Sequence, residues 1–244
     1  MKMPYALKKL RRMLGELRRG TTGIITRVAT AEPVAALTFD DGPHPVFTPR
    51  LLDILERHQA RATFFMIGQN AYCHPELVQR IGQAGHAIGN HSWDHAIFPL
   101  ITGRKRRAQL RACARAIAPY GERLFRPPHG YYNVPSQLDV LWLGYRAINW
   151  SFEVNDWCSL DADRMAERLV SQTQPGSIIL LHDGLCDVPE ERFMDRRPML
   201  SALDTFLERI GDGFRFVTLP ELLQYGRAER QGIHWFKRPN DYVQ

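Results

Sequence analysis

Two histidines separated by three residues, His91 and His95, have a spacing that could hold a metal ion. On one helical turn, side chains four residues apart share a face, so both imidazoles could reach the same cation. Two surface or capping histidines would show the same spacing, so the pair needs support from elsewhere in the sequence. It predicts a candidate metal site that lacks, so far, its remaining ligands.

Two adjacent carboxylates strengthen this prediction. Asp40 and Asp41 end an otherwise apolar run, Val34–Phe39, which is typical of a buried strand. Burying both carboxylates unpaired would be costly, and the alternative is a solvated turn. Gly42 and Pro43 bend the chain directly afterwards, so both carboxylates can face the end of the strand. We therefore expect one of them to join the histidines.

The chemistry that this set supports is hydrolysis. Two histidines and one carboxylate suit zinc or a similar metal and leave room for water. Such a metal lowers the pKa of its bound water to about 7. The second carboxylate is then available as a general base.

The order of expected elements indicates how these groups meet. Short apolar or β-branched runs alternate with helix-like stretches, which predicts parallel strands joined by helical crossovers. The expected strands are Val34–Phe39, Ala62–Ile67, Ala87–Gly89, Leu124–Arg126, Tyr145–Trp150, Ser177–Leu181 and Phe214–Val217. The expected helices are Thr48–His58, Pro75–Ala84, Arg104–Ile117, Ser136–Leu143, Asp161–Gln172 and Pro198–Ile210. About seven such units favour an α/β barrel, whose chemistry lies at the carboxyl ends of its strands.

Polar clusters follow several expected strands at that end. His91 and His95 follow the third strand, Arg126 ends the fourth, and His182 directly follows the sixth. Together with the two aspartates after the first strand, these residues predict one converging site.

Five motifs in this order resemble the NodB-homology polysaccharide deacetylases, the fourth carbohydrate esterase family. They are Thr38-Phe39-Asp40-Asp41-Gly42-Pro43, His91-Ser92-Trp93-Asp94-His95, Arg126-Pro127-Pro128-His129-Gly130, Asp156-Trp157 and Ile178-Ile179-Leu180-Leu181-His182. The resemblance implies a distorted (β/α)7 barrel. It divides the chain into a basic amphipathic segment at 1–30, a NodB-homology domain at 31–226 and a C-terminal extension at 227–244.

The resemblance implies a role for the residues of the metal site. Asp41, His91 and His95 would bind the metal, with zinc as the default and cobalt or nickel able to use the same ligands. Asp40 would be the base that takes a proton from the attacking water. Arg126 would pair with Asp40 and hold it in place, although a surface ion pair is the alternative for this arginine.

The resemblance also implies the acid and the acyl pocket. His182 would protonate the leaving amine, and Asp156 would orient and charge-stabilise it. Trp157 and Leu180 would help form a small apolar pocket for the acyl methyl group. The alternatives are a structural histidine for His182, an ordinary loop for Asp156 and Trp157, and a plain core position for Leu180.

His129 departs from the family pattern, which usually has an aromatic residue, often tyrosine, at this position. In the family, the backbone N–H at this position helps to bind the oxyanion, and any residue except proline supplies one. The wall of the sugar subsite therefore differs. We expect His129 to contact substrate; the alternatives are a pH sensor, a residue that approaches the metal and a polar residue of the rim. Tyr131 and Tyr132 are expected on the same rim.

The expected activity is removal of an N-acetyl or similar small acyl group from an amino sugar in a glycan or a glycolipid precursor. One alternative is removal of a formyl group from a lipid-linked 4-formamido sugar. Another is a catalytically silent sugar-binding protein, which is disfavoured because all five motifs keep their reactive residues. Nucleic-acid binding is disfavoured because the pI near 9.3 has no accompanying recognition motif.

The basic charge is concentrated at the N-terminus. Residues 1–27 contain eight lysines and arginines and one glutamate. Leucine and methionine side chains recur there at helical spacing, at Leu7, Leu10, Met13, Leu14 and Leu17. Such a helix could lie on an anionic membrane or pack against the barrel or a partner subunit. With no secretory signal visible, we expect a cytoplasmic protein, peripheral at the inner membrane face if the helix binds lipid.

Overall fold

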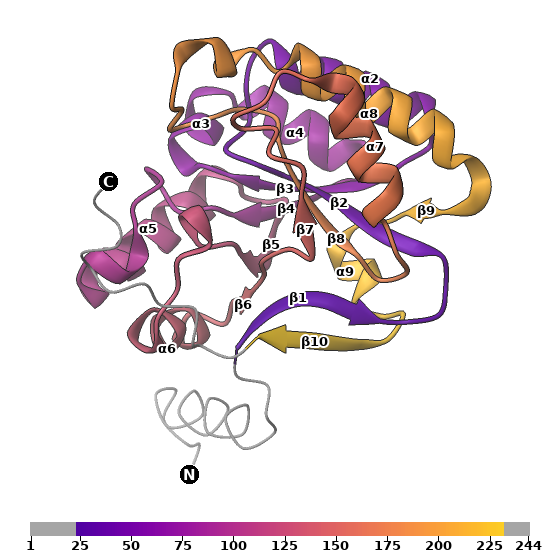
Figure 1. The fold of residues 1–244 in the computed structure, drawn as a ribbon. Coiled ribbons are helices and arrows are strands. Elements are labelled where there is room, and N and C mark those ends of the chain that lie inside the picture. Colours follow the sequence, from indigo (N-terminus) through magenta and orange to yellow (C-terminus); the bar gives the residue numbers. More distant parts are fainter. Residues whose placement is uncertain (1–22, 232–244) are drawn as a thin grey trace.

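The computed structural model describes residues 23–231, which form a curled parallel sheet covered by helices (Figure 1). Within these residues, no helix combines the length and the apolar character that crossing a membrane requires. The amphipathic helix expected in the first 27 residues and most of the expected extension after residue 226 lie outside the described residues.

The sheet orders its strands as a barrel that stays open at one seam. The order is β6-β5-β4-β3-β2-β8-β7, and β9 pairs with the beginning of β2. All of these pairings are parallel. The bounds are β2 (Val34–Asp40), β3 (Ala62–Met66), β4 (Ala87–Asn90), β5 (Gly121–Phe125), β6 (Arg146–Ala147), β7 (Phe152–Glu153), β8 (Ile178–His182) and β9 (Arg215–Phe216). The predicted distorted (β/α)7 barrel is thereby confirmed.

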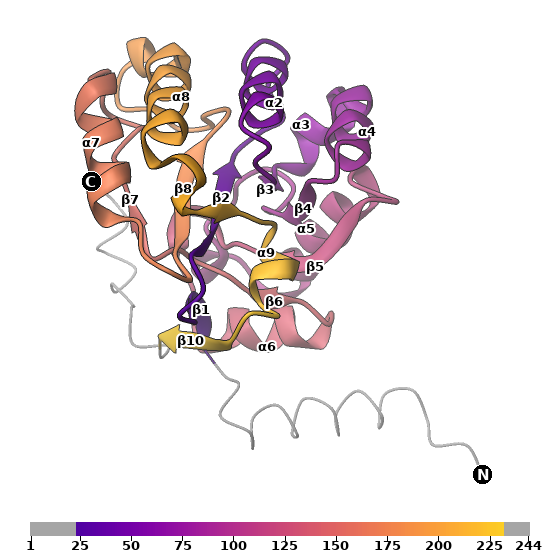
Figure 2. The same cartoon turned by 90° about the vertical axis from the view of Figure 1, so that its right-hand side faces the viewer.

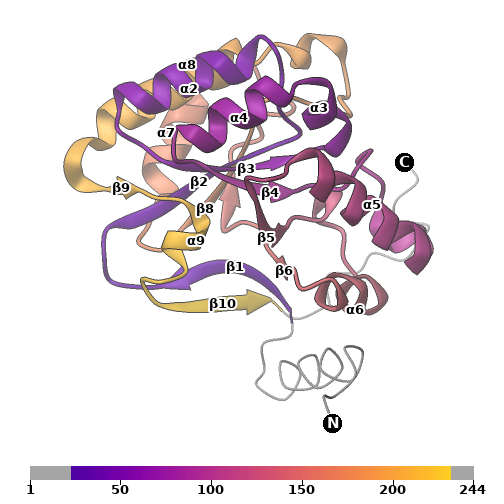
Figure 3. The ribbon, with the colours of Figure 1, turned by 180° about the vertical axis from the view of Figure 1, so that it is seen from behind.

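The helices cover the outside of the sheet. Their bounds are α2 (Phe47–Arg57), α3 (Gly68–Cys73), α4 (Pro75–Gln83), α5 (Gly103–Ala116), α6 (Val134–Trp142), α7 (Ala162–Gln172), α8 (Arg197–Ile210) and α9 (Leu219–Leu222). Helices α7, α8, α2 and α4 follow one another along one side (Figure 2). Helices α5 and α6 lie near β5 and β6 (Figure 3). The helices thus leave the carboxyl ends of the strands to the connecting loops.

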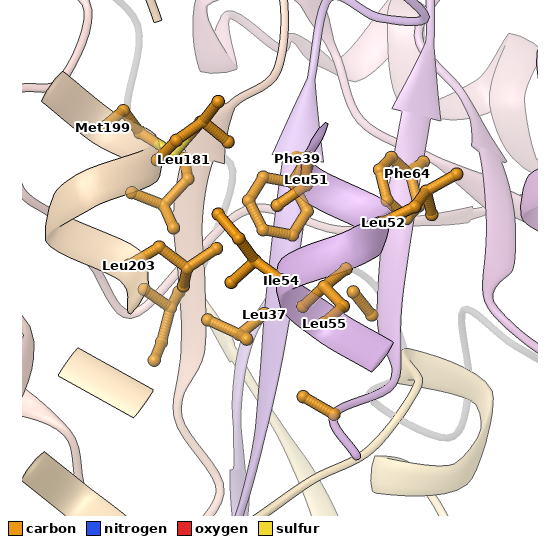
Figure 4. Close-up of a cluster of buried hydrophobic side chains, with 14 of the residues drawn as sticks. Leu37, Phe39, Leu51, Leu52, Ile54, Leu55, Phe64, Leu181, Met199 and Leu203 are labelled. Carbon is orange, nitrogen blue, oxygen red and sulfur yellow. The ribbon is translucent and has the colours of Figure 1, made fainter. Parts of the chain in front are cut away.

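The main core lies between β2 and the helices that cover it (Figure 4). Every residue of β2 is buried, and Leu37 and Phe39 point from it toward Leu51 and Leu55 of α2 and Leu203 of α8. Burying a side chain of this size stabilises the fold by about 1.5–3 kcal/mol. The strand that ends in Asp40 is therefore among the most firmly held parts of the molecule.

Two strands that were not expected from the sequence form a separate, two-stranded sheet. β1 (Ile24–Ala29) pairs antiparallel with β10 (Arg227–Gln231), and both lie on the opposite side from α2 and α8 (Figure 1). Ile25 and Val28 are fully buried, so β1 shares the core of the barrel. The division at residues 30/31 and 226/227 stays a prediction.

Candidate active site

The two strands at the centre of the sheet bring the first and fifth motifs together. In the parallel pairing of β2 with β8, Asp40 is the direct register partner of His182. Asp41 follows with a φ of 70°, in the left-handed region, so the chain turns sharply after the strand. Both carboxylates consequently stay at the strand end, where neither is more than 4% exposed.

Asp41, His91 and His95 meet at this strand end. Oδ1 of Asp41 lies 3.3 Å from Nε2 of His91 and 3.3 Å from Nε2 of His95. All three residues are buried, and their ligand atoms lie within 4.8 Å of one another. The three residues expected to bind one cation are therefore close enough to do so.

The backbone that presents the two histidines differs from the one expected. Residues 91–95 form a loop after β4 rather than a helical turn. Ser92 has a φ of 70° and His95 a φ of 61°, which a right-handed helix does not accommodate. The helical-turn interpretation of the spacing was wrong, yet the loop brings both imidazoles to the same carboxylate.

The hydrogen bonds of this cluster leave two of its inner atoms available to a cation. The His91 Nδ1–H donates to the carbonyl oxygen of Arg126 at 2.9 Å, because a carbonyl can only accept. In the neutral imidazole, Nε2 then has a free lone pair, and it faces the acceptor Oδ1 of Asp41. Oδ1 is buried and has no hydrogen-bond partner. The donor set fits a divalent metal of the zinc type.

The charge states of the cluster also suit a metal. Burial raises the pKa of Asp41, but the neighbouring side chains of His91 and His95 lower it by more, to well below its usual range. Burial lowers the pKa of His95, and Asp41 opposes that effect only in part. A carboxylate and a neutral imidazole are the forms that bind cations.

Asp40 is paired with a buried arginine, as the motifs predict. Arg126, directly after β5, is fully buried and donates from Nη1 to Oδ1 of Asp40 at 2.7 Å and to Oγ1 of Thr38 at 2.9 Å. Its guanidinium carbon lies 4.2 Å from the centre of the Phe65 ring. Such a charge-assisted pair fixes the position of the carboxylate.

His182 is held by Asp156 at the end of β8. The His182 Nδ1–H donates to Oδ1 of Asp156 at 3.0 Å, and its backbone N–H donates to Oδ2 at 2.9 Å. Burial lowers the pKa of His182, but Asp156, with smaller contributions from Asp41 and Asp40, raises it to about 9. The imidazole is therefore mostly protonated at neutral pH.

A cleft of about 420 Å³ opens above these residues. Leu180, Trp157, Tyr131 and His129 all line it. Tyr132 does not, and its expected place on the rim was wrong, because its side chain is buried in a hydrophobic cluster. Leu180 is 2% exposed and Trp157 36% exposed, so the cleft has an apolar floor and a more open aromatic wall. The four residues expected to contact substrate lie where a substrate could reach them, and their individual roles stay predictions.

His129 occupies the rim with a strained backbone. Its φ is 56°, in the left-handed region, and its ring lies 4.5 Å from that of His95 and 5.5 Å from that of Tyr131. Burial, assisted by His95, lowers the pKa of His129 to about 4, so the side chain is neutral at neutral pH. A neutral imidazole at this position can donate or accept a hydrogen bond.

A family model described as polysaccharide deacetylase matches residues 27–148 of this chain. A peptidoglycan-N-acetylglucosamine deacetylase of Bacillus cereus is 35% identical over 210 residues, covering 84% of this chain and 95% of the relative. The chain belongs to the polysaccharide deacetylase family. A chitooligosaccharide deacetylase of Sinorhizobium fredii is also 35% identical, over 205 residues, covering 81% of this chain and 95% of the relative.

Solved structures of deacetylases and carbohydrate esterases show the same architecture. A peptidoglycan N-acetylglucosamine deacetylase has a TM-score of 0.77 at 29% identity, covering 87% of this chain and 98% of that one. A family 4 carbohydrate esterase from Streptomyces lividans, in complex with acetate, has a TM-score of 0.70 at 29% identity, covering 83% and 99%. These likenesses confirm both the resemblance and the fold predicted from the motifs.

Two residues of the site were not expected from the sequence. Arg196 is 1% exposed and donates from Nη2 to Oδ2 of Asp156 and from Nε to the carbonyl oxygen of His182. It thus forms a buried ion pair with Asp156, as Arg126 does with Asp40. Asp187 lies 3.2 Å from Nδ1 of His95. Neither residue belongs to a motif, and only the arrangement of the loop after β8 reveals them.

Proposed function

We propose that this protein is a metal-dependent hydrolase that removes the N-acetyl group from an acetylated amino sugar in a glycan. The observation that supports this most directly is that two charge-paired groups share one cleft with a possible cation site. Asp40, paired with Arg126, and His182, paired with Asp156, end neighbouring strands and line the same cleft as Asp41, His91 and His95.

Asp41, His91 and His95 would hold the cation, with zinc as the first choice and cobalt or nickel as alternatives. When bound, such a cation polarises the amide carbonyl and makes the attacking water more acidic. The protein supplies the remaining steps. Asp40, held in place by Arg126, accepts a proton from the water as it attacks.

His182 completes the reaction by donating a proton to the departing nitrogen. An amine leaves an amide only when its nitrogen is protonated, and Nδ1 of His182 is already used by Asp156. Nε2 is therefore the nitrogen available for transfer. With a pKa of about 9, most His182 side chains hold the required proton at neutral pH.

The cleft favours a small acyl group on a sugar. Leu180 and Trp157 supply apolar surface for a methyl group, which contributes about 0.8 kcal/mol of binding. The aromatic rings of Trp157 and Tyr131 offer flat surfaces for a sugar ring. The relatives are named for N-acetylglucosamine in peptidoglycan and for chitooligosaccharides, so glycans of N-acetylglucosamine are the first substrates to test.

Three further parts of the proposal rest on the sequence alone. They are a lipid-linked precursor as substrate, contact with an anionic membrane through residues 1–27, and a place at the inner membrane face. A formyl group remains the alternative acyl group, and its release distinguishes the two substrates.

The test is a substrate screen with the zinc-loaded full chain, in which released acetate and formate are measured separately. We expect acetate from N-acetylglucosamine oligosaccharides or peptidoglycan fragments. As a control, Asp40→Asn should abolish turnover and retain the cation, because Asp40 acts on the water. Turnover at the wild-type rate in this variant would refute the assigned base, and no acetate from any amino sugar would refute the activity.

A further inference from the structure

The loop between β8 and α8 contacts two of the three proposed cation ligands. The backbone N–H of Cys186 donates to Oδ2 of Asp41 at 3.0 Å. The next residue, Asp187, places its Oδ2 3.2 Å from Nδ1 of His95. Two adjacent residues of this loop therefore contact Oδ2 of Asp41 and Nδ1 of His95.

The two imidazoles are oriented by partners of different kinds. The His91 Nδ1–H donates to the backbone carbonyl of Arg126, at the buried end of β5. The His95 Nδ1–H donates to a side chain, Asp187, which is 67% exposed on a surface loop. Partners of a ligating imidazole fix its tautomer and ring orientation, and their loss typically weakens metal binding by about 10–100-fold.

We propose that Asp187 is a positioning residue for the cation: it accepts the Nδ1–H of His95 and so keeps Nε2 directed at Asp41. This inference rests on the proposed function, since it requires that a cation binds there. Nε2 of His129 also lies 3.7 Å from Oδ2 of this carboxylate. Asp187 thus lies between a cation ligand and the rim of the cleft.

The effect of Asp187 can be measured by zinc binding to the full chain, using competition with a chromogenic chelator. We expect Asp187→Ala to weaken zinc binding by about 10–100-fold. Asp187→Glu should restore most of the affinity, because it returns a carboxylate to an exposed loop that can adapt. Glu190→Gln is the matched control, since Glu190 is exposed on the same loop and pairs with Arg192.

Two further readouts separate positioning from folding. The melting temperature of metal-free Asp187→Ala should equal that of the wild type, because the side chain is largely exposed. The visible absorption spectrum of the cobalt-loaded variant should change, because the geometry at His95 changes. A lower melting temperature without rescue by Asp187→Glu would assign a structural role and overturn the proposal.

Equal zinc affinity of Asp187→Ala and wild type would also overturn it. That result leaves the proposed function standing, provided that zinc binding by the wild type is lost in Asp41→Asn. If wild-type zinc binding does not depend on Asp41, the cation site itself is refuted, and the inference about Asp187 with it.

Discussion

Replacing Asp156 by asparagine tests how His182 obtains its proton. Asp156 is the strongest of the groups that raise the pKa of His182, and it contacts both the imidazole and the backbone of that residue. Asparagine has nearly the same shape, but it removes the negative charge. Burial, which lowers the pKa of His182, then acts with much less opposition.

The size of the effect follows from the pKa. At pH 7.5, an imidazole with a pKa of about 9 is about 97% protonated, whereas one at its ordinary value of 6.5 is about 9% protonated. The difference between the two pKa values corresponds to about 3 kcal/mol. We therefore expect the turnover of Asp156→Asn at pH 7.5 to fall at least tenfold, with the optimum moved toward acid pH.

The assay is the rate of acetate release as a function of pH, with circular dichroism to establish that the variant is folded. That control matters because Arg196 loses its buried charged partner. Asp195→Asn is the matched variant, since Asp195 pairs with the exposed Arg197. A folded Asp156→Asn with the wild-type pH profile would refute this account of the acid.

Three further predictions concern the acyl pocket and stability. Leu180→Ala enlarges the apolar floor of the cleft, so the ratio of kcat/KM for propionyl over acetyl substrates should rise, and an unchanged ratio would remove Leu180 from the pocket. The raised pKa of His182 stabilises the fold fully below pH 6.5, and this stabilisation is lost as pH rises through about 9. The free energy of unfolding of the metal-free chain, measured with denaturant, should therefore fall by about 3 kcal/mol over that window. Asp156→Asn should not show this fall if the assignment is correct. Gly42→Ala would place a Cβ 2.3 Å from the carboxylate oxygens of buried Asp183, whereas the Cβ of Gly213→Ala would meet nothing within 4 Å. Thermal unfolding should show a loss of about 1–3 kcal/mol in the free energy of unfolding only for Gly42→Ala. Equal stability of the two variants would contradict the packing.

Strand ends explain why much of this site could be predicted from the sequence. Reactive residues followed apolar runs, and the carboxyl ends of parallel strands meet at one edge of the sheet. Asp40 and His182, far apart in the chain, are for that reason register partners on neighbouring strands. The family motifs then assigned roles that local patterns leave open.

Irregular loops explain what the sequence concealed. The spacing of His91 and His95 suggested a helical turn, but two left-handed residues produce a loop instead. Arg196 stands beside Arg197 in the sequence, and nothing local indicates that the first is buried and the second exposed. Such contacts depend on the path of the loop after β8, which has no periodic pattern.

Zinc binding by the wild type and by Asp41→Asn tests the central claim most directly, with Asp94→Asn as the control from the loop between the histidines. Asp94 accepts a hydrogen bond from Gln109 at 2.8 Å and does not belong to the Asp41, His91 and His95 cluster. We expect the wild type and Asp94→Asn to bind one zinc ion per chain and to lose acetate release when it is removed, whereas Asp41→Asn binds none. Full activity of the zinc-stripped wild type, or unchanged zinc binding by Asp41→Asn, would contradict the account.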